Sequence, residues 1–478
     1  MTAIRWMVSR EEAIILLIYL ISYVFYRCVL HIPFDATPIN GYMQYLDPAL
    51  LKQDLLRSLW YLHSQPPLMN FIAGVALKIG GDYADVLLAG IYFVCGMIVL
   101  IFLSRAFVLL GVRRFLRMGM CIWLCAFPTF ILYANWAYAA HLEFSMCCVT
   151  LYYLAKLFDG DKLTFGAGLA LFLPCTILEF LRSQWHLVFF VGMAAIILWM
   201  RRKSPGKACF SSGSALALSP VVLLYLKNFL VFGFFGASSW MGMNLAEVAS
   251  EIVPKTELEM LQQSGDVSPF FPVRFKPEMA EMVRDEWNRT GQDVVNLQHP
   301  ALARKKSNGI ENYNYLPYIE GSKQDLQDSL AVISYAPMAY IKEVYARVEN
   351  GMHWPSIAYP HRDLIDGWGE WVHRGCVLLY MICPALALGL ALWPKGYMAQ
   401  HRNWILTAMF LTACITVSSS AFTFGGESER MRWGVAPFYL TFFVMLLESA
   451  ARISLPIRYF LRRTTCLLRF LQRRSAVW

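Results

Sequence analysis

The stretch DVLLAGIYFVCGMIVLIFLSRAFVLLG, residues 85–111, decides the fold class of this chain. A helix needs about 20 apolar residues to cross the hydrocarbon core of a bilayer, and this run supplies them. Comparable apolar runs lie near 12–32, 118–136, 144–158, 164–181, 186–200, 209–232, 375–393, 404–424 and 433–450. We therefore predict an all-α polytopic membrane protein with about ten transmembrane helices.

The composition of the whole chain agrees with this fold class. Of its 478 residues, 57% are hydrophobic and 16% are charged, whereas a soluble domain carries about 25% charged residues. A soluble chain could not cover so much apolar surface, which excludes a soluble enzyme, a disordered regulator and a disulfide scaffold. The net charge of +9 fits Lys and Arg in cytoplasmic loops, so we expect no nucleic-acid partner.

Basic residues between the apolar runs predict the topology. If the N-terminus lies in the cytoplasm, all of the basic clusters fall on the cytoplasmic side, as the positive-inside rule requires. The first run carries Glu11 and Glu12 and lacks a small-residue cleavage site, so we expect an uncleaved helix there. The clusters are Arg113, Arg114 and Arg117; Lys156 and Lys162; Arg201, Arg202, Lys203 and Lys207; Lys395 and Arg402; and the Arg-rich tail.

This topology divides the chain into four predicted parts. They are an N-terminal transmembrane core at 1–232 with a first outer loop at 33–84, a large extracytoplasmic region of mixed character at 233–374, C-terminal transmembrane helices at 375–450, and a basic cytoplasmic tail at 451–478. The apolar segment 67–80 is too short for a full span, and we expect an interfacial or re-entrant helix on the outer side.

The first outer loop contains polar residues that the topology does not require. It reads PFDATPINGYMQYLDPALLKQDLLRSLWYLHSQPPLMNF over residues 33–71. Asp35 and Asp47 are carboxylates that could act as a general base on an acceptor. His63 and Gln65 precede a Pro-Pro turn. The alternative is an ordinary juxtamembrane amphipathic helix with solvated carboxylates.

Two motifs resemble the GT-C superfamily of membrane glycosyltransferases, which includes the protein O-mannosyltransferases and the aminoarabinose transferases of lipid A. The first is His63-Ser-Gln-Pro-Pro-Leu68, which is similar to the element that closes the first outer loop in that family. The second is GESERMR at 426–432, followed by Pro437 at the start of a late helix. The resemblance covers roughly residues 1–240 and the last helices, and it implies a GT-C-like fold.

The resemblance also implies a chemistry. Such enzymes take a sugar from a polyprenyl-phosphate donor, and an Asp of the first outer loop activates the acceptor. By this resemblance Asp35 or Asp47 is the base, with Asp35 ranked first. This sequence lacks the family's usual acidic pair. Gln65 replaces the family's lysine, which leaves the donor phosphate to His63 or to an Arg elsewhere.

Three polar residues near the predicted outer turns are further candidates. The resemblance makes Glu143 a second acid beside the first-loop Asp; the alternative is a Glu that interacts with the dipole at a helix N-terminus. His141 lies in the same turn. Arg182 lies on the outer side against the positive-inside trend, so it requires a partner such as a donor phosphate or, alternatively, a lipid headgroup.

Four residues complete the predicted substrate-binding set. Arg430 and Arg432 belong to the second motif and are predicted phosphate ligands. Trp240 and Asn244 are residue types that stack on a sugar ring and bind its hydroxyls, or they are ordinary loop packing.

The sequence shows no metal-binding motif, no P-loop and no dinucleotide fingerprint, so we expect no nucleotide-sugar donor. A divalent metal ion is left open, because some relatives use one. We predict an integral-membrane hexosyl or pentosyl transferase with a lipid, glycan or protein acceptor. We expect it in the bacterial inner membrane, in contact with membrane lipid and with its active site facing the periplasm or exterior. The alternatives are a lipid-linked sugar flippase or transporter and, third, a polysaccharide polymerase or ligase.

Overall fold

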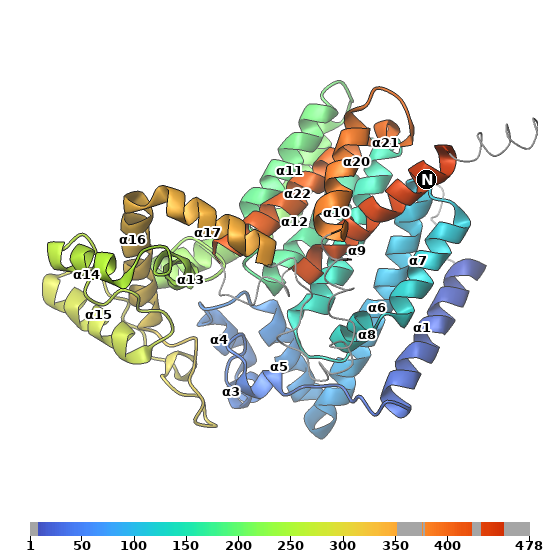
Figure 1. Cartoon of the computed structure of the whole chain (residues 1–478). Helices are drawn as coiled ribbons and strands as arrows, with labels where there is room; N and C mark the ends of the chain where they lie inside the picture. The colour runs from blue at the N-terminus through green and yellow to red at the C-terminus, as the bar shows by residue number, and fades with distance from the viewer. Residues whose placement is uncertain (1–7, 351–374, 376–377, 423–431, 454–478) are drawn as a thin grey trace, which may run out of the picture.

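The computed structural model describes residues 8–350, 375, 378–422 and 432–453. Within these residues every regular element is a helix, and extended pairing is limited to two isolated bridges, Asp35 with Trp136 and Lys305 with Glu311. A helical bundle fills one side of the molecule, and a set of shorter helices projects from its other side (Figure 1). The prediction of an all-α fold is confirmed for this part of the chain.

The bundle is built from two stretches of the chain. Its N-terminal helices are α1 (Arg10–Cys28), α6 (Ala84–Leu109), α7 (Arg114–Ala126), α8 (Pro128–Ala134), α9 (Ala139–Phe158), α10 (Phe165–Leu181), α11 (Leu187–Met200) and α12 (Lys207–Phe232). Its C-terminal elements are the short π-helix η3 (Leu378–Ile382), α20 (Cys383–Leu392), α21 (Tyr397–Gln400), α22 (Arg402–Ala421) and a last helix, Arg432–Ile453.

Four helical segments of the described residues are long and apolar enough to cross a membrane, or five if one bent pair counts as a span. They are Leu68–Leu109, Lys207–Phe232, Arg402–Ala421 and Arg432–Ile453, and the bent pair is α7 with α8. Shorter apolar helices occupy Phe165–Leu181, Leu187–Met200 and Leu378–Leu392. The chain is therefore a multi-pass membrane protein.

The predicted span at 118–136 is broken in the middle. Helices α7 and α8 meet at an angle of 60°. Phe127 between them has an extended backbone, and Pro128 opens α8. A residue before proline avoids the helical conformation because of a clash with the proline ring, so this single proline explains the bend.

The basic loops gather at one end of the bundle. The guanidinium of Arg114 pairs with Glu11 of α1 at 2.7 Å. The guanidinium of Arg113 pairs with Glu448 of the last helix at 3.0 Å, and Glu448 also pairs with Arg452. These contacts place the start of α1, the α6–α7 turn and the end of the last helix side by side, as the charge pattern predicts.

Short helices cover the opposite end of the bundle. They are α2 (Pro38–Gly41), α3 (Pro48–Gln53), α4 (Leu55–Trp60), α5 (Leu68–Gly80) and the 3₁₀ turn η1 (Gly81–Tyr83). The 13 residues of α5 extend about 20 Å, less than the roughly 30 Å of a hydrocarbon core. Helix α5 packs on α3 and α6 and buries Met69, Ala73 and Ala76 in a shared core.

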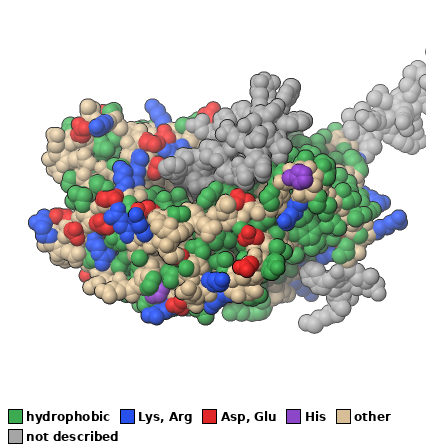
Figure 2. Space-filling model, turned by 90° about the horizontal axis from the view of Figure 1, so that it is seen from below, with side chains coloured by type: hydrophobic (Ala, Val, Ile, Leu, Met, Phe, Trp, Pro, Cys, Tyr) green, Lys and Arg blue, Asp and Glu red, His purple; other side chains and the backbone are tan. Residues whose placement is uncertain are grey.

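The region after α12 forms its own small helical core. It contains α13 (Met241–Ala249), α14 (Lys255–Ser264), α15 (Pro277–Thr290), the turn η2 (Pro300–Leu302), α16 (Tyr318–Tyr335) and α17 (Pro337–Asn350). Helices α13 and α16 pack closely at Gly242, where an added Cβ would lie 1.7 Å from the backbone oxygen of Ser322. Seen from the side of the short loops, charged side chains gather over these helices and apolar ones over the bundle (Figure 2).

Candidate functional site

A cavity of about 740 Å³ lies where the bundle meets helices α13–α17, which we call the outer helices. We call it the central cavity. Its walls come from the first outer loop, the α10–α11 turn, the start of α13, helix α16 and the end of α22. The lining residues include Gln44, Gln65, Arg182, Gln184, Phe189, Phe235, Trp240, Met241, Asn244, Lys323, Ser419 and Phe422. The cavity thus brings together Gln65, Arg182, Trp240 and Asn244, four of the residues predicted from the sequence.

The lining of the central cavity includes cations and amides, which we call its polar wall. Arg182 and Gln184 come from the α10–α11 turn, and Lys323 comes from α16. No ion pair within the described residues involves Lys323. Gln65 and Asn244 add amide groups that can donate and accept hydrogen bonds. This wall can bind an anion with hydroxyl groups beside it.

The rest of the lining of the central cavity is largely apolar. Phe189 extends from the start of α11, and Phe422 follows the end of α22. Phe235 and Met241 are exposed outside the cavity as well. The indole of Trp240 packs against Phe275 and donates a hydrogen bond to the backbone oxygen of Tyr313. The central cavity therefore suits an amphiphile with a polar head.

Arg182 is held in place from behind. Its guanidinium donates to the hydroxyl of Tyr138 and lies 5.0 Å from the centre of the Tyr138 ring. The same hydroxyl accepts from the amide of Gln44 at 2.9 Å. Because Tyr138 and Gln44 belong to the packed outer end of the bundle, the cation has a fixed position in the wall.

Glu143 lies directly behind this wall and is fully buried. Its carboxylate pairs with Arg182 at 3.6 Å and accepts from the side chains of Gln184 at 2.9 Å and Trp185 at 3.2 Å. Gly434 of the last helix packs against it, and an added Cβ there would lie 2.7 Å from the carboxylate. Glu143 thus organises the α10–α11 turn.

His63 joins the first outer loop to the outer helices. Its Nε2 lies 3.1 Å from the backbone oxygen of Asn314, and its Nδ1 lies 2.8 Å from the hydroxyl of Ser239. A carbonyl can only accept, so Nε2 carries the proton and Nδ1 accepts from the serine. Burial and the cation of Lys227 lower the pKa of His63 to about 3. The imidazole is therefore a neutral structural link.

Asp47 has a structural role in the same loop. It caps α3 by accepting from the backbone N–H of Ala49 at 2.9 Å. It also accepts from the backbone N–H and the hydroxyl of Ser307, at 2.6 Å and 2.8 Å. Nearby Lys306 is buried, and burial lowers its pKa to about 8. These bonds fasten the loop around residue 307 onto the first outer loop.

Asp35 is half-buried and accepts fewer hydrogen bonds than Asp47. Its Oδ1 accepts from the backbone N–H of Thr37 at 2.9 Å and from the Thr37 hydroxyl at 2.6 Å. Within the described residues no hydrogen bond reaches its Oδ2. Its backbone pairs with Trp136, whose ring stacks on Tyr138 at 4.6 Å. A chain of contacts therefore connects Asp35 to Tyr138 and Arg182.

Asp35, Asp47, His63 and Glu143 do not line the central cavity, and neither do the remaining predicted residues that the structure describes. His141 is buried against Tyr92 and Phe130, and neither ring nitrogen has a hydrogen-bond partner among the described residues. Arg432 is buried and donates to the backbone oxygen of Val348 at 2.9 Å, at the end of α17. Arg430 lies outside the described residues.

The described residues do not gather three His, Cys, Asp or Glu side chains close enough to hold a metal ion. The polar wall consists of cations and amides, which do not fit a divalent metal.

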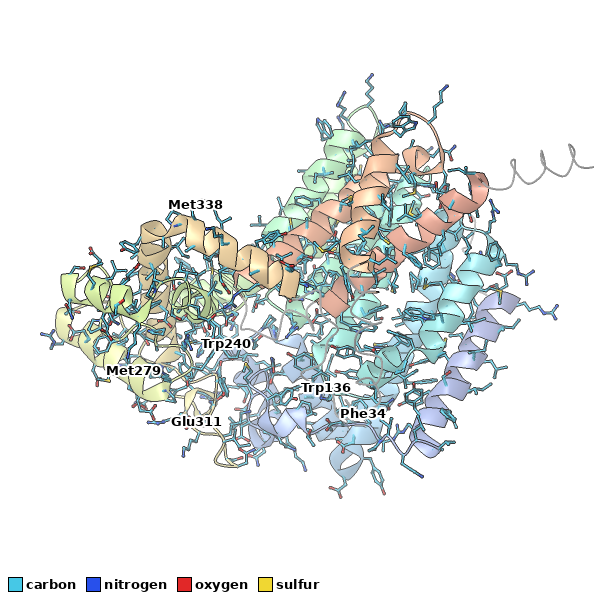
Figure 3. All side chains as sticks on the ribbon, in the orientation of Figure 1. Phe34, Trp136, Trp240, Met279, Glu311 and Met338 are labelled. Atoms are coloured by element: carbon cyan, nitrogen blue, oxygen red, sulfur yellow. The ribbon has the colours of Figure 1, made fainter. Side chains whose placement is uncertain are left out.

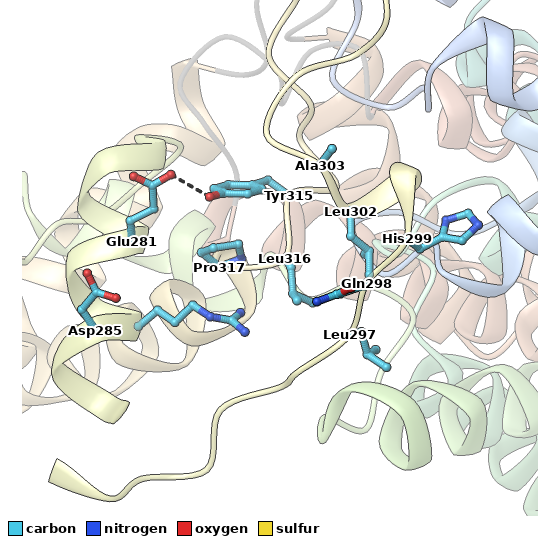
Figure 4. A pocket seen from close by; sticks show the side chains of 11 residues that line it. Glu281, Asp285, Leu297, Gln298, His299, Leu302, Ala303, Tyr315, Leu316 and Pro317 are labelled. Carbon is cyan, nitrogen blue, oxygen red and sulfur yellow. Dashed lines mark hydrogen bonds between the residues drawn. The ribbon is translucent and has the colours of Figure 1, made fainter. Parts of the chain in front are cut away.

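A second cavity, of about 520 Å³, lies between α15 and residues 297–303 and 315–317 (Figure 4). The hydroxyl of Tyr315 donates to Glu281 at 2.6 Å, as the figure shows. The cation of Arg284 is already bound to Glu320 at 3.4 Å and to the backbone oxygen of Val295. Because the charged groups of this second cavity largely bind one another, the central cavity is the better candidate site.

No protein-family model matches the chain, and no curated protein matches its sequence. Among solved structures, ArnT from Cupriavidus metallidurans bound to undecaprenyl phosphate is similar, with 13% identity, a TM-score of 0.31, and coverage of 88% of this chain and 77% of that one. An oligosaccharyltransferase from Archaeoglobus fulgidus, in complex with Zn and sulfate, has 11% identity and a TM-score of 0.33 and covers 91% of this chain and 52% of that one.

Two residues of the cavity lining, Lys323 and Gln44, carry no signal in the sequence that marks them as functional. Lys323 lies in the polar stretch EGSKQD at 320–325, which has the composition of any solvated helix. Only the close packing of α13 on α16 turns this lysine toward the central cavity.

Proposed function

We propose that this protein is a membrane glycosyltransferase that moves a sugar from a polyprenyl-phosphate donor to an acceptor on the outer side of the membrane. The main support is the central cavity, which combines the cations Arg182 and Lys323 with apolar side chains at the outer ends of the spans. This pairing suits a lipid phosphate. The motif around His63 and Pro66-Pro67, which resembles the GT-C enzymes, supports the same assignment.

In the proposed reaction Asp35 takes the proton of an acceptor hydroxyl or amine. The acceptor atom then forms a bond to the anomeric carbon, and the bond between that carbon and the phosphate oxygen breaks. The electron pair leaves with the polyprenyl phosphate, whose added negative charge Arg182 and Lys323 stabilise. Attack from the side opposite the phosphate inverts the anomeric centre.

Other residues have supporting roles in this proposal. Glu143 is a positioning residue, because it orients Arg182 and Gln184 rather than facing the central cavity. Trp240 and Asn244 offer an aromatic face and an amide to the sugar or the acceptor. Asp47 and His63 hold the first outer loop against the outer helices, so Asp35 is preferred to Asp47 as the base.

The proposed topology has ten spans. Besides the helices that meet the length and composition requirement, we propose that α1, α9, α10, α11 and the stretch 378–392 also cross the membrane. Their ends lie with the same two groups of loops as the longer helices (Figure 1). The end with Arg113 and Arg114 is then cytoplasmic, and the central cavity faces the periplasm or exterior of a bacterial inner membrane.

Donor binding tests the proposal directly. Binding of undecaprenyl phosphate to the purified full chain in lipid nanodiscs is compared with binding to Lys323→Gln and Arg182→Gln. We expect each variant to bind at least about tenfold more weakly, because each removes a charge-assisted contact to phosphate. Lys255→Gln is the matched control, since Lys255 is exposed on α14, outside the central cavity.

Lys323→Gln is the decisive variant, because Lys323 has no ion pair in the described structure that its loss would break. If both pocket variants bind the lipid phosphate as tightly as Lys255→Gln does, the central cavity is not the donor site and the proposal fails.

A lipid-linked sugar flippase is the second candidate, and one observation favours it. Glu179 is fully buried in α10, and its carboxylate accepts a hydrogen bond from the hydroxyl of Tyr225 in α12. Buried carboxylates in spans often mark transport pathways. Reconstituted protein that moves the lipid-linked sugar between leaflets, yet never releases free polyprenyl phosphate, would favour this reading.

A further inference from the structure

Helix α17 carries an apolar face that nothing in the described structure covers. Met338, Ile341 and Tyr345 are 63%, 57% and 64% exposed. Their spacing of three and four residues places them in one stripe along the helix. Lys342 lies beside them, is exposed, and makes no ion pair within the described residues.

The opposite side of α17 is fastened to the protein. The hydroxyl of Tyr340 donates to the backbone oxygen of Ala421 at the end of α22. Arg347 pairs with Glu251 at 2.6 Å, next to α13. Arg432, at the start of the last helix, donates to the last turn of α17. Helix α17 is therefore fixed across the outer ends of two spans with its apolar stripe turned away from them.

The direction of the stripe is visible in the structure. Helix α17 runs across the spans rather than along them, on the side of the outer helices nearest the bundle (Figure 1). Met338 projects from its upper edge, toward the level occupied by the spans, whereas Met279 lies on the far side of the outer helices (Figure 3). At the junction, Val417 of α22 is exposed on the surface of a candidate span. Exposed apolar side chains therefore lie on both α17 and α22, two helices that contact each other.

We propose that the α17 stripe, formed by Met338, Ile341 and Tyr345, is seated in the headgroup and upper acyl layer of the membrane on the side of the outer loops. An amphipathic helix with one apolar face and a neighbouring lysine is the kind of element that lies in this layer. Tyrosine suits it, because its ring is apolar and its hydroxyl reaches water. Lys342 then contacts lipid phosphates.

Contact of the α17 stripe with the membrane also determines the depth of the central cavity. Helix α17 contacts α22, whose Ser419 lines the central cavity together with Phe422 just beyond the helix end. A stripe anchored in lipid therefore holds the cavity at the depth of the headgroups, where a lipid phosphate would enter from the side. The inference itself does not depend on sugar transfer, because a transporter with this fold would be seated in the same way.

Spin-label accessibility tests the inference. Single cysteines at Met338 and at Met282 are labelled in full-length protein reconstituted in vesicles of phosphatidylethanolamine and phosphatidylglycerol, and the signal of identically treated wild type is subtracted. Met282 is the matched control, because it is an exposed methionine on α15. We expect the ratio of collisions with dissolved oxygen to collisions with a water-soluble nickel chelate to be several-fold higher for Met338→Cys.

A third labelled position, Tyr345→Cys, checks that the whole stripe behaves alike. If the nickel chelate reaches Met338→Cys and Tyr345→Cys as readily as Met282→Cys, the stripe faces water and the inference is wrong. If neither reagent reaches them, another protein segment or a second copy of the chain covers the stripe, which also overturns it. Lipid-phosphate binding by the same variants reports separately on the proposed function.

Discussion

Asp35 and Asp47 lie in the same loop, but their carboxylates differ in how many groups they bind. Asp47 accepts from the backbone of Ala49 and from both donors of Ser307. Asp35 binds only its neighbour Thr37 through one oxygen, within the described residues. A carboxylate used as a base needs an accessible oxygen, so the surrounding bonds separate a structural Asp from a chemical one.

His63 gives a pH-dependent prediction at the residue scale. Its pKa is about 3 in the folded protein, below its ordinary value of 6.5. The folded state therefore binds fewer protons, and stability falls as pH decreases from 6.5 toward 3. At pH 5.5 the expected loss from this residue is on the order of 1 kcal/mol relative to high pH.

The measurement is the thermal unfolding of wild type and His63→Gln at pH 7.5 and pH 5.5. Wild type should lose more stability on acidification than His63→Gln, which has no imidazole to protonate. Equal losses in the two proteins would show that His63 is not the buried neutral link described here.

The residue types in the motifs could be recognised from the sequence, but their partners could not. Arg182 was expected to need a partner because it opposes the charge rule, and the structure supplies Tyr138 and Glu143. The phosphate role expected for His63 came from a resemblance that carries no information on burial. Its bonds to Ser239 and Asn314 join positions far apart in the chain, and no local pattern encodes them.

At the element scale, apolar runs located the helices well because bilayer thickness sets their length. The bend at Pro128 also has a local signal, since proline breaks a helix at its own position. The sequence of residues 233–350 contains no comparable local signal for its fold. Its helices are short and polar on one face, and their arrangement depends on contacts such as α13 with α16.

Gly242 tests that contact. Replacing Gly242 with alanine places a Cβ 1.7 Å from the backbone oxygen of Ser322, so α13 and α16 must separate. We expect a loss of at least about 2 kcal/mol of stability, measured by thermal unfolding. Gly90→Ala is the control, because an added Cβ there meets nothing within 4 Å; helix propensity predicts a neutral or slightly stabilising effect. A Gly242→Ala protein as stable as the control would contradict the described packing.

At the scale of the whole molecule, the charge distribution distinguishes the two ends of the helical bundle. Arg113 pairs with Glu448, and Arg201 donates to the backbone oxygen of Leu157, so the two segments of each pair lie side by side. The outer loops meet at the other side through Asn314 and Ser307. Charge bias between loops is a global rule, which is why a topology can be predicted without knowing any contact, and this topology stays a prediction.

Cysteine labelling tests this arrangement. Lys203→Cys and Asp293→Cys place thiols at exposed positions of the two proposed sides. An impermeant thiol reagent should label Asp293→Cys in intact cells and Lys203→Cys only after the membrane is opened, above the background of wild type. Labelling of both thiols in intact cells would rule out the proposed topology.

The most direct test of sugar transfer is the release of free polyprenyl phosphate from a polyprenyl-phosphate sugar by purified wild type, Asp35→Asn and Asp47→Asn. Membrane-derived acceptors are included, and undecaprenyl phosphate binding is measured in parallel. We expect wild type to release the lipid phosphate and label the acceptor. Asp35→Asn should keep binding and lose about 10²-fold or more in rate. Asp47→Asn should lose mainly stability, by about 1–3 kcal/mol, because it weakens a helix cap and buried hydrogen bonds. Binding without any release by wild type, or full activity of Asp35→Asn, would contradict the account.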